Sequence, residues 1–192
     1  MKVYQRTASG NCHKVRLCLS ALGLDYEAVD LVLEQQQEPW FLQLSPAGQI
    51  PVLEDQGAAI SDSLAIMVYL AEQHDHQAKW LPKEGVAKAK VLSWMGYANS
   101  TIHLGLTRLY GADFFHRPLD RADAEVVALK TLALLEQTLS QSAWLCGSEP
   151  SLADLAVYPY VERLSLTQLS TAKYPSLEAW VGGIKKAPWY VQ

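Results

Sequence analysis

The stretch KVYQRTASGNCHKVRLCLSALG, residues 2–23, joins a strand pattern to a helix pattern and decides the fold of the first half of the chain. Residues 2–7 have the composition of a short strand, and residues 11–22 carry apolar side chains at helical spacing. Gly23 follows as a typical helix stop. Because small polar residues at 9–11 precede the helix, its N-terminus is predicted to be well capped and to present unpaired N–H groups.

The segments that follow continue the same alternation of strands and helices. A strand is expected at 26–32, a short helix at 40–45, a hairpin at 51–61 and a helix at 63–74. Asp62 or Ser63 is placed to cap this last helix. The order β-α-β-α-β-β-α predicts an α/β domain over residues 1–77.

The second half of the chain shows helical patterns only. Residues 78–86 contain Pro and Gly and are predicted to form a linker, with a helical domain over 87–192. Helices are expected at 86–110, 120–140, 150–166 and 175–187. Ser151 and Asp154 form a capping pair, for which we expect a structural role. The second half is therefore predicted to be an all-α bundle.

Composition excludes several classes of function. The chain has 192 residues, 49% of them hydrophobic, and a net charge of −4, so a basic nucleic-acid surface is not expected. The longest apolar run, residues 64–71, is shorter than the ~18 residues that a membrane helix needs. The N-terminus lacks the apolar core of a signal peptide, and the three cysteines form no C-x-x-C pair or zinc spacing. We therefore expect a cytoplasmic protein with reduced thiols, no metal and no membrane or nucleic-acid partner.

The polar residues at 9–11 leave three chemical readings open. They can act only as a helix cap, they can bind a phosphate, or they can stabilise a thiolate. Neither G-x-G-x-x-G nor a Lys-containing phosphate loop is present. Cys12 can be a small buried side chain or a nucleophile. A serine hydroxyl such as that of Ser9 can donate a hydrogen bond to a sulfur without reacting itself.

Two further segments point to an extended ligand that carries charge. Pro51 opens a strand, and a cis Ile50–Pro51 bond would leave the backbone of Ile50 available to pair with a peptide. Asp62 and Ser63 then place a carboxylate, a hydroxyl and helix N–H groups together. This arrangement suits a ligand that has both an ammonium and a carboxylate.

Four segments together resemble the cytosolic glutathione transferases: SGNCHKVRL (9–17), LSPAGQIPVLED (44–55), ISDSLAIMVYLAE (60–72) and PSLADLAVYPYV (150–161). They follow one another in the order and spacing of that family, and they look most like bacterial members with Ser or Thr in the active-site turn. The resemblance implies a thioredoxin-like N-terminal domain plus an all-α C-terminal helical bundle. It also implies a homodimer that uses glutathione as co-substrate, with no other cofactor.

The resemblance assigns roles to individual residues. Ser9 would hydrogen-bond the glutathione sulfur, with Asn11 as a second polar group beside it. Ile50 and a cis Pro51 would pair with the cysteinyl backbone, and Gln49 would approach the glycine end.

Asp62 and Ser63 would hold the γ-glutamyl group of glutathione. An electrophile pocket would lie against the long helix, with Ser100, His103 and Thr107 as candidate residues.

Two remaining residues near the site are given structural roles. Tyr4 is expected to pack within the first strand, and His13 to lie at a surface or an interface.

The function implied is a glutathione transferase that activates the glutathione thiolate for attack on a hydrophobic electrophile. Two alternatives stay open. One is a glutathione-dependent disulfide reductase or isomerase, with Cys12 as a possible participant. The other is a non-catalytic glutathione-binding module.

Overall fold

The computed structural model describes residues 1–192 and divides into two units. The first unit holds residues 1–81 and 189–192, and the second holds residues 82–188. The division lies inside the predicted linker at 78–86. Residues 189–192, which the sequence predicts as part of the helical domain, group with the first unit. They do so because they contact His13, Arg16 and Trp80 of that unit.

The first unit has the predicted α/β order. Its elements are β1 (Lys2–Gln5), α1 (Gly10–Ala21), β2 (Glu27–Asp30), the 3₁₀ turn η1 (Glu34–Gln37), α2 (Pro39–Leu44), β3 (Val52–Asp55), β4 (Ala58–Ser61) and α3 (Ser63–His74). The sheet has the strand order β2-β1-β3-β4, in which β1 runs parallel to β2 and antiparallel to β3. This mixed sheet with its helices is the thioredoxin-like arrangement that the family resemblance implies.

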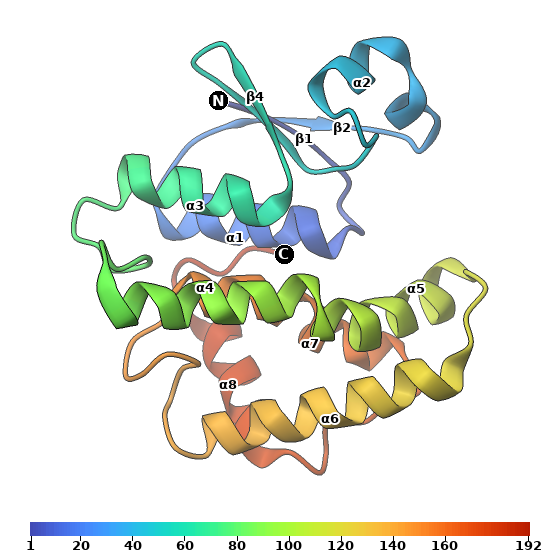
Figure 1. Cartoon of the computed structure of the whole chain (residues 1–192), viewed down its shortest axis with the longest axis vertical. Helices are drawn as coiled ribbons and strands as arrows, with labels where there is room; N and C mark the ends of the chain where they lie inside the picture. Colours follow the sequence, from blue (N-terminus) through green and yellow to red (C-terminus); the bar gives the residue numbers. More distant parts are fainter. The chain divides into compact units, whose positions relative to one another are not determined.

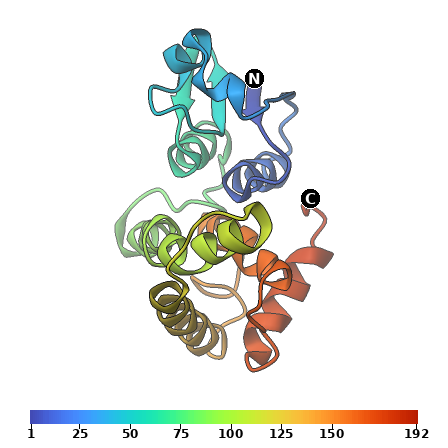
Figure 2. The ribbon, with the colours of Figure 1, turned by 90° about the vertical axis from the view of Figure 1, so that its right-hand side faces the viewer.

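Alternating residues of the strands bury the two faces of this sheet. Tyr4 and Val52 pack in one cluster with Phe41 of α2. Their neighbours Val3 and Leu53 are fully buried and point to the opposite face, because successive side chains of a strand alternate. Helices α1 and α3 lie side by side there, and Figures 1 and 2 show α2 across the sheet from them.

The second unit is all-α, as predicted. Its elements are α4 (Gly85–Asn99), the π-helical turn η2 (His103–Thr107), α5 (Arg108–Phe115), α6 (Arg121–Leu139), α7 (Leu152–Glu162), the 3₁₀ turn η3 (Arg163–Leu166) and α8 (Pro175–Lys186). Helix α4 packs on α7, and α6 packs on η2 and α8. None of the helices in either unit has the length and apolar content that crossing a membrane requires.

The capping pair of α7 has the structural role that we expected. The Ser151 hydroxyl accepts from the Ala153 N–H, and the Asp154 carboxylate accepts from the Ser151 N–H at 2.9 Å. Asp154 is fully buried and also accepts from Leu145 N–H and from Trp180 Nε1. These contacts tie the start of α7 to α8 and to the chain before it.

The single long helix predicted over residues 86–110 is wrong, because the helix is interrupted at Ser100. The Ser100 backbone leaves the helical region (φ −112°, ψ −90°), and its hydroxyl donates to the Gly96 carbonyl at 2.8 Å. Such back-bonding bends helices, and a π-turn widens them locally. Gly105 of η2 uses this geometry: a Cβ there would lie 2.7 Å from the Ala128 nitrogen of α6.

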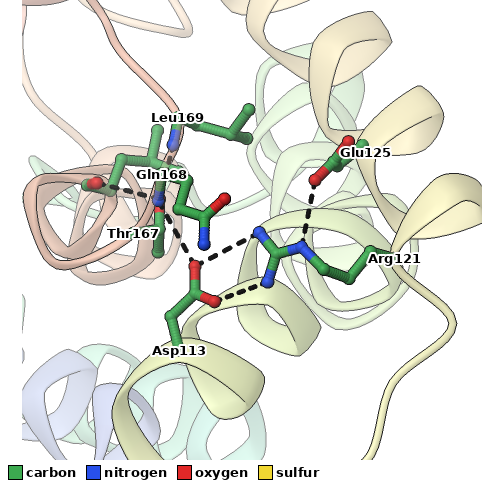
Figure 3. A network of polar contacts seen from close by, with 7 residues as sticks. Asp113, Arg121, Glu125, Thr167, Gln168 and Leu169 are labelled. Carbon is green, nitrogen blue, oxygen red and sulfur yellow. Dashed lines mark hydrogen bonds and ion pairs between the residues drawn. The ribbon is translucent and has the colours of Figure 1, made fainter.

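A polar network joins α5, α6 and the chain after η3 (Figure 3). Both Nη atoms of Arg121 donate to the Asp113 carboxylate, and its Nε donates to Glu125 at 3.2 Å. Asp113 also accepts from the Gln168 N–H at 3.3 Å. The network closes the turn between α5 and α6 within the second unit.

Candidate functional site

The strand register brings three chain segments of the first unit to one end of the sheet. Tyr4 of β1 pairs with Val52 of β3, which pairs with Ser61 of β4. The chain leaves β1 just after this row, enters β3 just before it, and leaves β4 just after it. The N-terminus of α1, the loop at 49–51 and the β4–α3 junction therefore lie next to one another.

Ser9 and Asn11 lie at the start of α1, as predicted. Ser9 is the N-cap, and its Oγ accepts from the Cys12 N–H at 3.3 Å. This contact uses an oxygen lone pair, so the hydroxyl hydrogen can still point to another acceptor. No acidic residue lies in the first turn of α1. The positive end of the helix dipole is therefore not neutralised by a nearby carboxylate and favours an anion.

Cys12 is fully buried, so its sulfur is not accessible as a nucleophile. Burial raises the pKa of its thiol, and this outweighs the Ser9 hydroxyl and the charges of Arg6 and Arg16, which lower it. A reactive cysteine needs the opposite balance, with an accessible sulfur and a lowered pKa. The groups around this turn favour a thiolate, but the sulfur of Cys12 is too deeply buried to become one readily.

The loop at 45–51 is held by its own short hydrogen bonds. The buried Ser45 accepts from the Gly48 N–H through its carbonyl and from the Gln49 N–H through its Oγ, at 2.8 and 3.0 Å. Gly48 has φ +61°, and a Cβ there would lie 2.9 Å from the Gln36 carbonyl oxygen. The Ile50–Pro51 bond is cis, in agreement with the sequence expectation.

Within this loop Gln49 is exposed, and the backbone of Ile50 lies outside the ladder that pairs β3 with β1. Both are thus placed at the open end of the sheet rather than inside it.

Asp62 and Ser63 begin α3, and Asp62 is its N-cap. One carboxylate oxygen of Asp62 accepts from the N–H groups of Leu64 and Ala65, at 2.9 and 3.1 Å. The Asp62 backbone has φ +79° and ψ 122°, a conformation that non-glycine residues rarely adopt. Ser63 is buried beside it, whereas Asp62 is exposed.

A buried lysine lies electrostatically coupled to this aspartate. Lys14 of α1 is fully buried. Burial lowers its pKa from 10.5 to about 8, and the negative charge of Asp62 opposes that shift. The end of the sheet therefore carries a cation inside the unit and a carboxylate at its surface.

The structure confirms the expectation for Tyr4 and corrects the one for His13. The Tyr4 hydroxyl donates to Glu54 at 2.6 Å, and burial together with this bond raises its pKa to about 12. Tyr4 is thus a packed residue of the sheet. The surface or interface position expected for His13 is wrong: His13 is 1% exposed, and its Nε2 bonds the Val191 carbonyl at 2.7 Å. The chain of residues 189–192 covers it.

The candidate pocket residues lie in the second unit, around the interruption of the helix. Ser100 ends α4 and is exposed, and His103 is the first residue of η2 and is also exposed. The Thr107 hydroxyl is buried and makes no hydrogen bond within the chain. The broken helix means that these three residues do not share one regular helical face, and their role stays a prediction.

Sequence reasoning missed several residues that shape the first unit. Lys14, Arg16 and Ser45 are buried polar side chains, and a single sequence does not distinguish them from solvated ones. The Ser-Pro-Ala-Gly order at 45–48 was the one usable signal, because a serine before such a turn often bonds the turn backbone. No group of three His, Cys, Asp or Glu side chains is arranged to hold a metal ion.

Comparison with protein families gives matches to both halves of the chain. Residues 3–79 match the family model described as glutathione S-transferase, N-terminal domain. Residues 118–183 match the one described as glutathione S-transferase, C-terminal domain.

Individual relatives are similar over nearly the whole chain. Glutathione S-transferase GstB of Escherichia coli K12 is 28% identical over 97% of this chain and 93% of the relative. Disulfide-bond oxidoreductase YfcG of the same organism is 30% identical over 93% of this chain and 87% of the relative. A glutathione S-transferase structure from Pseudomonas fluorescens Pf-5 superimposes with a TM-score of 0.91 at 29% identity, covering 100% of this chain and 97% of that one.

Proposed function

The chain belongs to the glutathione S-transferase family, and we propose that it binds glutathione at the open end of its sheet and activates the thiol through Ser9. The observation that carries this proposal is the strand register. It brings the N-terminus of α1, the loop at 49–51 and the β4–α3 junction to one place. These are the segments that a short extended peptide would need for its sulfur, its backbone and its charged end.

Each part of glutathione has a partner in this arrangement. The backbone of Ile50, beside the cis Pro51, pairs with the cysteinyl residue, and Gln49 approaches the glycine end. Asp62 attracts the γ-glutamyl ammonium, while the hydroxyl and the backbone N–H of Ser63 bind its carboxylate at the N-terminus of α3.

The activation of the sulfur rests on the groups around the first turn of α1. The Ser9 hydroxyl and the charges of Arg6 and Arg16 already lower the pKa of the Cys12 thiol, although burial outweighs them. A glutathione sulfur at the same turn, with Asn11 beside it, would meet favourable groups without that burial. A charge-assisted hydrogen bond is worth ~1.5–3 kcal/mol, which lowers a thiol pKa by about one to two units.

The reaction then follows from the ionised sulfur. The thiol proton passes to solvent, and the thiolate uses its electron pair to form a bond to an electrophilic carbon. A leaving group departs with its own bonding pair, or a double bond accepts the electrons. The electrophile is hydrophobic in this proposal, and Ser100, His103 and Thr107 are its candidate pocket residues. The unbonded, buried Thr107 hydroxyl supports a polar contact there.

Replacing Ser9 by alanine tests the proposal, with Ser151→Ala as the matched control. Both serines cap a helix, so each change should cost about 1–2 kcal/mol of stability. Only Ser9→Ala should lower kcat/KM for a simple aromatic electrophile near neutral pH, and the deficit should shrink as alkali ionises the thiol without help. A Ser9→Ala enzyme with an unchanged pH–rate profile contradicts the role of Ser9 and shifts the assignment to Asn11.

A second activity is favoured by the similarity to the oxidoreductase YfcG. Reduction of a disulfide by glutathione requires two thiols in turn. The burial of Cys12 argues against a protein thiol as the second one, so a second glutathione would have to supply it. Assays of conjugation and of disulfide reduction on the same preparation distinguish the two activities.

The assembly and the cellular location complete the proposal. We expect a homodimer, because symmetric dimers are the commonest oligomers of soluble proteins. Light scattering should give a mass near twice the 21.3 kDa of the chain, and a mass of one chain at micromolar concentration contradicts this. The three cysteines are unpaired, which agrees with a reducing compartment such as the cytoplasm.

A further inference from the structure

Arg16 is a buried charged side chain whose hydrogen bonds go in three directions. It lies on α1 and is 6% exposed. Its Nη1 donates to Gln5 Oε1 and its Nη2 to the Thr7 carbonyl, both at 3.2 Å, while its Nε donates to the Gln192 carbonyl at 3.3 Å. The guanidinium thus connects the end of β1, the turn after it and residue 192.

Two of these contacts act on the turn that carries Ser9. The Ser9 N–H donates to the Arg6 carbonyl at 3.0 Å, which closes a four-residue turn over residues 6–9. Thr7 is the second residue of that turn, and Gln5 directly precedes it. Arg16 therefore holds the turn from its own helix, about two helical turns beyond the cap Ser9.

The third contact belongs to residues 189–192, which the sequence predicts as part of the helical domain. Residues 189–192 lie against α1 through two side chains of that helix. His13 bonds the Val191 carbonyl at 2.7 Å, and Arg16 bonds the Gln192 carbonyl. His13 and Arg16 are three residues apart and so share one face of α1. Trp189 packs edge-on against Trp80, which secures the start of the segment.

We propose that Arg16 is a positioning residue for glutathione activation, which it serves by fixing the turn that presents Ser9, with residues 189–192 as its third anchor. The inference rests on the proposed role of Ser9. A lysine cannot replace Arg16, because an ammonium keeps the charge but loses the planar fork that reaches separate acceptors at once. A loosened turn lets the Ser9 hydroxyl leave the sulfur, so the fraction of bound thiolate falls.

The test measures the pKa of bound glutathione from thiolate absorbance in Arg16→Lys, in Ser9→Ala and in the double variant. Arg16→Lys should raise this pKa by up to about one unit, a loss of up to about tenfold in thiolate at neutral pH, with a smaller change in glutathione affinity. If Arg16 acts through Ser9, Arg16→Lys should add almost nothing in the Ser9→Ala background. Arg121→Lys is the matched control. Arg121 also contacts three acceptors, in the second unit, and its replacement should leave this pKa unchanged.

The possible results separate the two proposals. If Ser9→Ala raises the pKa and Arg16→Lys does not, the positioning role of Arg16 is overturned and the role of Ser9 stands. If Ser9→Ala itself has no effect, the proposed role of Ser9 fails, and the Arg16 inference fails with it. An equal Arg16→Lys shift with and without the Ser9 hydroxyl also overturns positioning through Ser9.

If Arg16→Lys does not fold, a truncated chain tests whether the anchoring of Arg16 affects the pKa of bound glutathione. Ending the chain after Tyr190 removes both acceptor residues, Val191 and Gln192, but keeps Arg16 and its contacts to the turn. The pKa of bound glutathione should rise in the same direction by a smaller amount, about threefold in thiolate. An unchanged pKa in this truncated chain overturns the anchoring role of residues 189–192.

Discussion

Replacing the buried Lys14 by methionine should make the protein more stable at neutral pH. Lys14 is fully buried, and methionine fills a similar volume without a charge. Burial lowers the pKa of Lys14 from 10.5 to about 8 in the folded state, and the Asp62 carboxylate recovers part of that cost. Because ~1.4 kcal/mol accompanies each pKa unit, keeping Lys14 protonated costs the folded state about 3 kcal/mol.

The sign of the pH dependence follows from the same values. Between pH 8 and 10.5 the unfolded chain holds a proton on Lys14 that the folded chain has released, so wild-type stability should rise with pH in this window. Below pH 8 the full cost is present, and above pH 10.5 it is absent. The advantage of Lys14→Met should therefore be up to about 3 kcal/mol at pH 7 and should disappear by about pH 10.5.

Urea unfolding at a series of pH values measures this difference, with Lys130→Met as the control. Lys130 is exposed on α6, so its replacement should give a small change that does not vary between pH 7 and 10.5. The reasoning is refuted if Lys14→Met is less stable than wild type at pH 7, or if its gain is the same at every pH.

Three further outcomes follow from the structure. Asp62→Asn keeps a good helix cap but removes the charge, so the KM for glutathione should rise about tenfold or more with little change in urea midpoint; an unchanged KM contradicts the γ-glutamyl role. Cys12→Ala should keep most conjugation and any disulfide reductase activity at a cost of about 1 kcal/mol, and loss of reductase activity alone would make Cys12 a participant. Gly105→Ala should destabilise the protein by about 1–3 kcal/mol because its Cβ meets the α6 backbone, whereas Gly96→Ala, with open space around it, should be neutral or stabilising in calorimetry.

The elements of the first unit were predictable because each carries a local signal. Gly23 stops α1, Gly57 marks the turn between β3 and β4, and Asp62 caps α3, so patterns of a few residues suffice. The prediction of one helix over 86–110 was wrong because no such local signal marks its interruption. The apolar spacing continues through Ser100, where the helix breaks, and the π-helical turn that follows brings Gly105 against α6, which is distant in sequence. Local periodicity contains no information about such a contact.

The candidate site shows the same division between local and distant information. Ser9, Pro51 and Asp62 occupy turns and helix starts whose residue types are visible in sequence. The side chains that hold these segments in place are not visible in the sequence. Arg16 and His13 have residue types typical of a solvated helix face, but both are buried and both bond the backbone of residues 191–192. One hydrogen-bond partner of Arg16 lies 176 residues away in sequence, and a single sequence cannot specify that pairing.

Asp62 combines an unfavourable backbone conformation with electrostatic coupling to a buried lysine, and finding both at one residue argues for a function. The other three non-glycine residues with positive φ have simple settings: Gln56 sits in a hairpin turn, Ala78 closes a turn through its N–H to the Asp75 carbonyl, and His116 ends α5. Asp62 combines φ +79° with ψ 122°, outside the left-handed region that such turns use, although it begins a helix that an ordinary extended cap would serve. It is also the carboxylate coupled to the buried Lys14, whose charge costs the fold stability. Folding alone favours neither feature, and both are accounted for if the chain holds an oriented carboxylate at this junction for the ammonium of a ligand.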